Sequence, residues 1–283
     1  MQHFDKATTE RIRHELPDFY TATLFAPKRK RLALLSLYSF HAELARIATS
    51  VSEPMLGEIK LQWWRDALQN AEQKVQIGHP VADNFAKVIK NYNIPKVHIA
   101  NMIDARSFDL SDEPMPDEQS LKIYLNKTYG GLFLISAYIL KQNFEDRKRL
   151  EKAGYMAGFA YGLTELLCTL PFQAARMRLS LPLSCLEDDS FSINQIHTEY
   201  GERFLKKAIT FFEQDIKRDF KDLQNTLSEF PEHIIPAFLP ACLVTIYLKQ
   251  IVQKNHNPTS DIIRINPLQR LFKYWSMCAF GSI

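Results

Sequence analysis

Residues 31–68 read RLALLSLYSFHAELARIATSVSEPMLGEIKLQWWRDAL and decide the fold. Over residues 32–47 apolar side chains occupy nearly every side of a helix, which is typical of a helix buried among other helices. The pattern therefore predicts a central helix. One face of it, which we expect to look into the core, carries residues at spacings of three and four: Ala42, Ala45 or Arg46, and Thr49.

The composition of the chain favours an all-α fold. Of the 283 residues, 46% are hydrophobic and 24% are charged, an ordinary balance for a globular protein. Glycines number only nine, and apolar residues rarely alternate with polar ones as they do in strands. Long helices are expected over residues 199–227 and 233–252, Pro54 is suited to the first turn of a restarted helix, and the glycines at 130–131 permit a close backbone approach or a kink. No repeat or shift in composition marks a boundary. We expect one domain over residues 1–283, with 1–16 as an N-terminal extension and 268–283 as an amphipathic tail.

The charge balance argues against nucleic acid as a partner. The net charge is +3, from 35 basic and 32 acidic residues. The one dense basic run, residues 28–31, is predicted to be a solvated first helical turn, with a contact to phosphate or anionic lipid as the alternative. Residues 1–20 lack the apolar core of a secretory signal, and no apolar stretch reaches the ~20 residues that a bilayer requires. We therefore expect a cytoplasmic protein, soluble or peripheral to the inner membrane.

Common catalytic and metal-binding patterns are missing from the sequence. It has no GxSxG, HExxH, Walker or dinucleotide-binding glycine motif, and its eight histidines are scattered. Its cysteines, at positions 168, 185, 242 and 278, lack the spacing of a zinc site, so we expect reduced, buried thiols. The acids of residues 109–118 and 187–189 lie in predicted loops, where carboxylates are usually solvated. These patterns predict no catalytic residue, no metal site and no cofactor.

Residues 38–49 resemble the first signature helix of the squalene/phytoene synthase family. In that family Tyr-Ala-Phe-Cys-Arg-x-x-Asp-Asp-x-x-Asp supplies the aspartates that hold magnesium against prenyl diphosphates. Tyr38 and Phe40 match the pattern. The family's arginine and three aspartates correspond here to Ala42, Ala45, Arg46 and Thr49. The resemblance thus keeps the helical frame without its metal ligands, and it is closer still to a branch that includes a mitochondrial complex I assembly factor.

Residues 154–186 resemble the second signature of the same family. That signature runs Gln-Leu-Thr-Asn-Ile-Leu-Arg-Asp, then a second aspartate, then Gly-Arg-x-Tyr-Leu-Pro. The chain matches it at Leu163, Thr164, Leu167, Arg178, Leu181 and Pro182. The glutamine, asparagine, arginine, two aspartates and glycine correspond to Gly162, Glu165, Cys168, Thr169, Gln173 and Met177. Upstream, Asp18 lies near the position of a family serine that approaches diphosphate, and an acid there would repel phosphate.

The resemblance covers residues 19–252 and implies an isoprenoid synthase-like helical bundle around a central cavity. The family reaction needs carboxylate-held Mg²⁺ to offset the charge of a leaving diphosphate. Each such charge pair is worth about 4 kcal/mol at ~4 Å and an effective dielectric near 20. We therefore expect a non-catalytic binding protein or respiratory-complex assembly factor. The alternative is an active head-to-head prenyltransferase, using farnesyl or geranylgeranyl diphosphate and Mg²⁺ held by acids such as Asp104 or Asp109.

The candidate ligand-binding residues are Tyr38, Arg46, Lys127, Glu165, Arg176 and Arg178. The expected ligand is an isoprenoid or another lipid, and the cations would bind its anionic group. Arg46 is predicted to pair either with Glu43 on its own helix or with Glu165 across the cavity. Arg178 has a structural alternative, in which it ties the turn at residues 181–182 to a carboxylate. The tail is expected to pack on the core, or to present an apolar face to a protein partner or a membrane.

Overall fold

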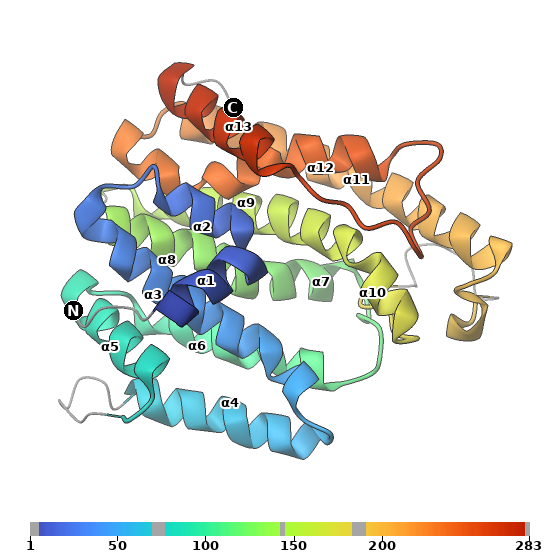
Figure 1. Cartoon of the computed structure of the whole chain (residues 1–283), viewed down its shortest axis with the longest axis horizontal. Coiled ribbons are helices and arrows are strands. Elements are labelled where there is room, and N and C mark those ends of the chain that lie inside the picture. Colours follow the sequence, from blue (N-terminus) through green and yellow to red (C-terminus); the bar gives the residue numbers. More distant parts are fainter. Residues whose placement is uncertain (1–5, 70–76, 142–144, 183–190, 281–283) are drawn as a thin grey trace.

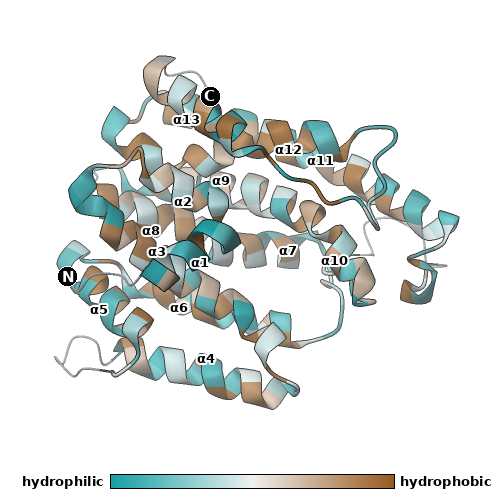
Figure 2. Ribbon diagram, viewed as in Figure 1, coloured by the Kyte–Doolittle hydropathy of each residue, from teal (hydrophilic) through white to brown (hydrophobic). Residues whose placement is uncertain are grey.

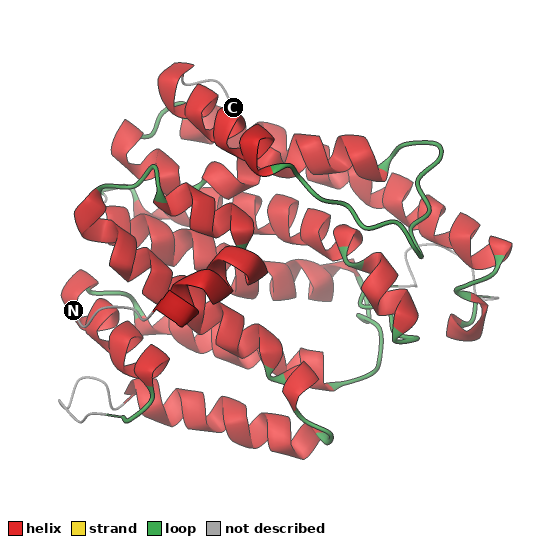
Figure 3. Cartoon of the chain, viewed as in Figure 1, coloured by secondary structure: helices red, strands yellow, loops and turns green. Residues whose placement is uncertain are grey.

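The computed structural model consists of helices and the loops between them (Figure 1). The residues that it describes are 6–69, 77–141, 145–182 and 191–280. Over these ranges no strand is present, which confirms the all-α prediction (Figure 3). Cys185 and the acids at 187–189 lie outside the described residues.

The helices of the first half are α1 (Lys6–Glu15), α2 (Pro17–Thr23), α3 (Lys28–Arg46), η1 (Ala48–Ser50), α4 (Pro54–Gln69), α5 (Pro80–Tyr92), α6 (Lys96–Asp104), η3 (Ala105–Leu110), α7 (Glu118–Leu125), η4 (Asn126–Gly130) and α8 (Gly131–Leu140). Those of the second half are α9 (Arg147–Cys168), α10 (Leu170–Ala175), η6 (Ile193–Gln195), α11 (Glu199–Leu227), η7 (Glu232–Ala237), η8 (Leu239–Leu243), α12 (Val244–Ile251) and α13 (Pro267–Phe280). The predicted restart at Pro54 and the predicted helix over residues 199–227 are both confirmed.

The centre of the bundle is α8, which packs against α3 on one side and α9 on the other. Every residue of α8 is buried, as expected for a helix that is apolar on all sides. The helices α11 and α12 pack against α9, and α5 packs against α3. Outer helices such as α4 and α11 carry both hydrophilic and hydrophobic residues (Figure 2). The predicted central helix is therefore α3, with a second, fully apolar helix beside it.

Gly158 of α9 and Gly130 of η4 allow the backbones of these two helices to cross in close contact. A Cβ atom on Gly158 would lie 2.2 Å from the backbone nitrogen of Gly130 and 2.4 Å from its Cα. No larger residue fits there without moving the backbone. The crossing coincides with the π-helical turn Asn126–Gly130. The close backbone approach expected from the glycine pair at 130–131 is confirmed.

The helix predicted over residues 233–252 is wrong in its first half. Residues 232–243 form the two 3₁₀ segments η7 and η8, and the α-helix begins only at Val244. Pro236 and Pro240 lie inside these segments and lack the backbone N–H that an α-helical turn requires. The apolar pattern indicated burial correctly, but the prolines exclude a continuous α-helix.

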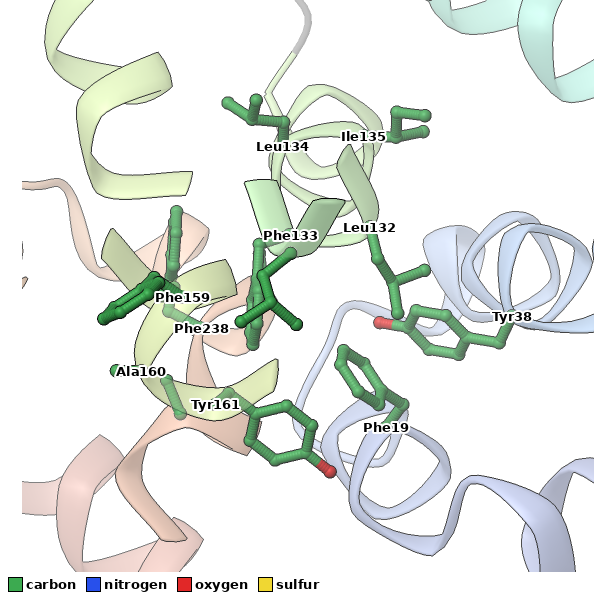
Figure 4. Close-up of a cluster of buried hydrophobic side chains, with 14 of the residues drawn as sticks. Phe19, Tyr38, Leu132, Phe133, Leu134, Ile135, Phe159, Ala160, Tyr161 and Phe238 are labelled. Carbon is green, nitrogen blue, oxygen red and sulfur yellow. The ribbon is translucent and has the colours of Figure 1, made fainter. Parts of the chain in front are cut away.

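Aromatic side chains fill the interior where α2, α3, α8 and α9 meet (Figure 4). The ring centroid of Phe19 lies 5.2 Å from that of Tyr38, 5.4 Å from Phe133 and 5.4 Å from Tyr161. Phe133 stacks on Phe238 at 6.0 Å. All five side chains are buried. At this level of the bundle, aromatic rings from four helices contact one another across the interior.

The tail helix α13 packs on the core through one face only. Arg270, Tyr274 and Met277 are buried and lie against η8, α2 and η7. Among the described residues, no helix is long and apolar enough to cross a bilayer.

Candidate functional site

A pocket of about 350 Å³ lies where the C-terminal ends of α3 and α9 approach each other. We call it the motif pocket; its lining includes Ala45, Thr49, Asp109, Leu166, Thr169, Phe172, Gln173, Arg176, Arg178 and Ser180. Ala45 and Thr49 come from one predicted family signature, and Thr169 and Gln173 come from the other. The fold therefore brings the two signatures to one place, as the resemblance implies.

At the matched signature positions, the polar side chains of this pocket are neutral and hydrogen-bonded within their own segments. The Thr49 hydroxyl donates to the Arg46 carbonyl oxygen at 3.1 Å, and the Thr169 hydroxyl donates to that of Leu166 at 2.8 Å. The Gln173 amide nitrogen donates to the Thr169 hydroxyl oxygen at 3.0 Å. These contacts rigidify the wall, and they contribute no negative charge to it.

Two arginines give the motif pocket a positive rim. Arg176 is exposed and has no ion-pair partner among the described residues. Arg178 donates from Nη1 to the carbonyl oxygen of Asp109 at 3.1 Å, and the same atom lies 3.9 Å from the exposed carboxylate of Asp112. Its buried Nε has no hydrogen-bond partner within the described part of the chain. Arg178 thus ties α10 to η3 and keeps one donor uncommitted.

Asp109 is already held by neighbouring side chains. Its carboxylate accepts from Arg106 Nη1 at 2.9 Å and from the Tyr124 hydroxyl at 2.7 Å. Arg106 is buried, so this ion pair lies inside the protein. Burial and the charge of Arg106 hold the pKa of nearby His41 well below its usual range, and the ring Nδ1 of His41 lacks a partner among the described residues.

A second polar cluster, centred on Asp18, lies deep in the bundle. The Asp18 carboxylate accepts from the hydroxyls of Tyr161 and Tyr247, each at 2.8 Å, and from Arg270 Nε at 2.5 Å. The Tyr274 hydroxyl donates to the Asp18 carbonyl oxygen at 3.2 Å. Asp18 is 2% exposed and Arg270 is 6% exposed. The cluster therefore joins α2, α9, α12 and α13 through one buried ion pair.

Glu165 lies near the Asp18 cluster and is half-buried. Loss of water around its carboxyl group raises its pKa to about 7, and the neighbouring Asp18 carboxylate adds to this shift, whereas Arg270 opposes it. Within the described residues, Glu165 has no ion-pair partner. With this pKa, the carboxyl group changes its protonation state near neutral pH.

Arg46 does not reach Glu165, so the predicted ion pair across the cavity is wrong. Its Nη2 lies 2.7 Å from the Glu43 carboxylate and its Nη1 lies 3.3 Å from Glu15 of α1. Glu43 also pairs with Arg11 at 2.9 Å. The helix α1 packs along α3 and offers acids on the outside, which draws the guanidinium away from the interior. The local alternative, Glu43, is confirmed.

Two further candidates lie away from the motif pocket. Tyr38 is fully buried, and its hydroxyl oxygen accepts from Ser136 at 3.3 Å. Lys127 is half-buried in η4 and does not line the motif pocket. Of the six candidates, the structure brings together Arg176 and Arg178 in one pocket, and it places Glu165 in a second region.

The residues at the matched motif positions do not fit a magnesium cluster. Mg²⁺ prefers carboxylate and phosphate oxygens in octahedral geometry, whereas Ala45, Thr49, Thr169 and Gln173 offer none. The two acids of the alternative hypothesis are held by arginines, because Asp104 pairs with Arg65 at 2.7 Å and Asp109 pairs with Arg106. Across the described ranges, no three His, Cys, Asp or Glu side chains form a group that could hold a metal ion.

The sequence interpretation missed the partners of Asp18. Asp18 stood out as an acid where phosphate would be repelled, but Arg270 lies 252 residues away along the chain. The available signal was the spacing of Arg270, Tyr274 and Met277, which places all three on one face of a helix. An arginine on that otherwise apolar face predicts a buried carboxylate partner.

The helical bundle and the meeting of two signature regions at one pocket define the class of all-α isoprenoid synthase-fold proteins. The crystal structure of a squalene synthase from Alicyclobacillus acidocaldarius aligns with a TM-score of 0.73 at 16% identity, covering 87% of this chain and 92% of that one. This similarity establishes the fold.

The sequence comparisons identify the family within that class. The sequence model of squalene/phytoene synthase matches residues 12–270, and the chain belongs to this family. NADH dehydrogenase (ubiquinone) complex I, assembly factor 6, from Bos taurus is 26% identical over 88% of this chain and 74% of its own length. A presqualene diphosphate synthase from Sinorhizobium fredii is 22% identical over 90% of this chain and 92% of its own.

Proposed function

We propose that this chain is a non-catalytic squalene/phytoene synthase family protein that acts in the assembly of a respiratory NADH dehydrogenase. The observation that carries the proposal is the motif pocket, whose matched positions hold alanine, threonine and glutamine in place of magnesium-binding carboxylates. The similarity to complex I assembly factor 6 supports the assembly role. The similarity to a presqualene diphosphate synthase supports the alternative, an active prenyltransferase.

The loss of catalysis follows from charge. A prenyl diphosphate can ionise only if cations offset the charge of the departing diphosphate. Arg176 and Arg178 can bind an anion, but without a carboxylate set they cannot recruit further cations beside it. The same two arginines allow a phosphorylated isoprenoid or lipid to bind without turnover, and we propose such a ligand for the motif pocket. Neither a metal ion nor a cofactor is part of this proposal.

We place the protein in the cytoplasm, at or near the inner membrane, because its partner would be a membrane-bound complex. Removing the gene from the source organism should reduce the assembled NADH dehydrogenase on native gels, and a plasmid copy should restore it. Normal assembly together with loss of a squalene-type or phytoene-type product would contradict the proposal and favour the synthase.

The proposed ligand is tested separately with a non-hydrolysable farnesyl diphosphate analogue. We expect Arg176→Gln to weaken its binding by about tenfold without changing stability, because Arg176 is exposed and charge-assisted hydrogen bonds to phosphate are strong. Arg178→Gln should lower both affinity and stability, because Arg178 also holds the Asp109 carbonyl oxygen. Lys127→Gln is the matched control. Equal binding by all three variants would place the ligand elsewhere.

A further inference from the structure

The tail helix α13 exposes a continuous apolar stripe on the face opposite its buried anchor. Leu268 is 75% exposed, Phe272 is 67% exposed and Trp275 is 51% exposed, and Leu271 lies beside them at 37%. We call these four residues the α13 stripe. Because Arg270 and Tyr274 on the other face are bonded to Asp18, the helix is firmly seated and the stripe stays outward. Figure 1 shows α13 along the outer edge of the molecule.

The surroundings of the α13 stripe are rich in positive charge. Residues 262–283 contain no acid, and their cations outside the buried pair of Arg270 with Asp18 are Arg264 and Lys273. The basic run at residues 28–31 borders the C-terminal end of α13, since Lys28 and Arg31 share a pocket of about 800 Å³ with Met277 and Cys278. Residues 19–42, which include that run, also contain no acid. Glu232 lines the same pocket as Lys28 and Arg31. At the other end of α13, Leu271 shares a second pocket with Glu10, whose carboxylate lies 3.7 Å from Arg13.

A second exposed apolar face, on α4, has a different charge environment. Met55 and Ile59 are 72% and 59% exposed, but acids accompany them at Glu53, Glu58 and Asp66. In Figure 1, α4 lies at the opposite edge of the molecule from α13. Trp63 of α4 is also exposed, at 40%, so among the described residues the two faces differ in their charges and not in their apolar side chains.

We propose that the α13 stripe lies on the surface of a membrane that contains anionic lipid, with α13 parallel to the bilayer. An amphipathic helix with leucine, phenylalanine and tryptophan on one face and cations beside it partitions into the interface in this way. Lys28, which shares a pocket with the C-terminal end of α13, and its neighbour Arg29 are both exposed, and they contact the anionic headgroups. The proposed assembly role does not depend on this contact, and failure of either leaves the other in place.

Sedimentation with lipid vesicles tests the proposal. The intact chain should bind vesicles of phosphatidylcholine mixed with phosphatidylglycerol, and should bind pure phosphatidylcholine much more weakly. Phe272→Ser with Trp275→Ser should weaken binding by about tenfold or more, because both side chains are more than half exposed on the α13 stripe. The matched control, Met55→Ser with Ile59→Ser, removes two equally exposed apolar side chains from α4 and should leave binding unchanged.

A second variant tests how much the cations contribute to vesicle binding. Lys28→Gln with Arg29→Gln should weaken binding to the mixed vesicles by roughly fivefold per cation and reduce its salt dependence. Arg31 is left intact because it donates to the carbonyl oxygens of Ala26 and Leu24. Brominated lipid should quench the fluorescence of the intact chain, and this quenching should disappear in Trp275→Phe.

Three results would overturn the proposal. The first is failure of the intact chain to bind the mixed vesicles. The second is an equal loss of binding in the α4 control. The third is a dimer in sedimentation velocity that dissociates in the Phe272→Ser, Trp275→Ser variant, since a second copy of the chain would then cover the stripe.

Discussion

Asp18 is the residue on which the interior depends most directly. Its carboxylate is almost fully buried and is stabilised by Arg270 and by the hydroxyls of Tyr161 and Tyr247. A buried charge that loses its partner is costly, whereas removing both members of a pair costs less. The cluster therefore specifies how α13, near the C-terminus, packs against α2, near the N-terminus.

We expect Asp18→Asn and Arg270→Met each to lower the free energy of unfolding by about 3–5 kcal/mol. The double variant should lose clearly less than the sum, because it strands no buried charge. Urea unfolding of the four proteins measures the coupling. Additive losses would mean that the two side chains do not stabilise each other. Glu43→Gln, which alters a surface pair of Arg46, serves as the control and should change stability by about 1 kcal/mol or less.

Glu165 should make stability depend on pH in an unusual direction for an acid. Because its folded pKa is about 7, above the ordinary value for glutamate, the folded state holds a proton that the unfolded state releases. The stabilisation that Glu165 provides is fully present below the pKa of glutamate in the unfolded chain, and it is lost as the pH rises through 7. His41 acts in the opposite sense. Because burial lowers its pKa, protonation of the unfolded chain in acid lowers the stability of the folded protein.

A comparison of the wild type with Glu165→Gln isolates this effect, because His41 is common to both. The stability of the variant relative to the wild type should rise between pH 5 and pH 8 in urea unfolding. A difference that is constant over this range would show that Glu165 is ionised throughout.

At the scale of elements, the crossing of α9 over the π-helical turn brings two helix backbones into close contact. An alanine inside a helix is normally more stable than glycine by up to about 1 kcal/mol. At Gly158 we expect the reverse sign, with Gly158→Ala destabilising by about 1–3 kcal/mol or more, because its Cβ would meet the backbone of Gly130. Thermal unfolding beside the exposed control Lys152→Ala gives the sign. A more stable Gly158→Ala would contradict the crossing.

Several elements could be predicted from the sequence because their signals are local. Burial of α3 follows from apolar residues on all its sides, the start of α4 follows from Pro54, and α11 follows from its long amphipathic period. The segment at residues 232–243 could not be predicted as helix from apolar content, because two prolines convert it to 3₁₀ turns.

The candidate site was predictable only where the resemblance supplied a register. That register matched Arg178, which lines the motif pocket with positions of both signatures, whereas Arg176 lines the same pocket without a matched position. It could not place Arg46, because the competing acid Glu15 comes from α1, outside residues 19–252 over which the resemblance extends. Nor could it reveal the pairing of Asp18 with Arg270, which depends on how the two ends of the chain meet in space.

At the scale of the whole molecule, a synthase fold is kept while its centre is filled with the chain's own side chains. The interior contains the packed rings of Phe19, Tyr38, Phe133 and Tyr161. The ion pair of Asp18 with Arg270 holds α13 against this interior. The proposed assembly role requires a surface that binds a partner and requires no reaction in this interior.

The most direct test of this account is release of inorganic diphosphate from farnesyl or geranylgeranyl diphosphate in the presence of Mg²⁺. An active squalene/phytoene synthase serves as the positive control for the assay. We predict release no faster than in the protein-free reaction, because Ala45, Thr49, Thr169 and Gln173 supply no carboxylate for the metal. Magnesium-dependent release with formation of a head-to-head product would contradict the account.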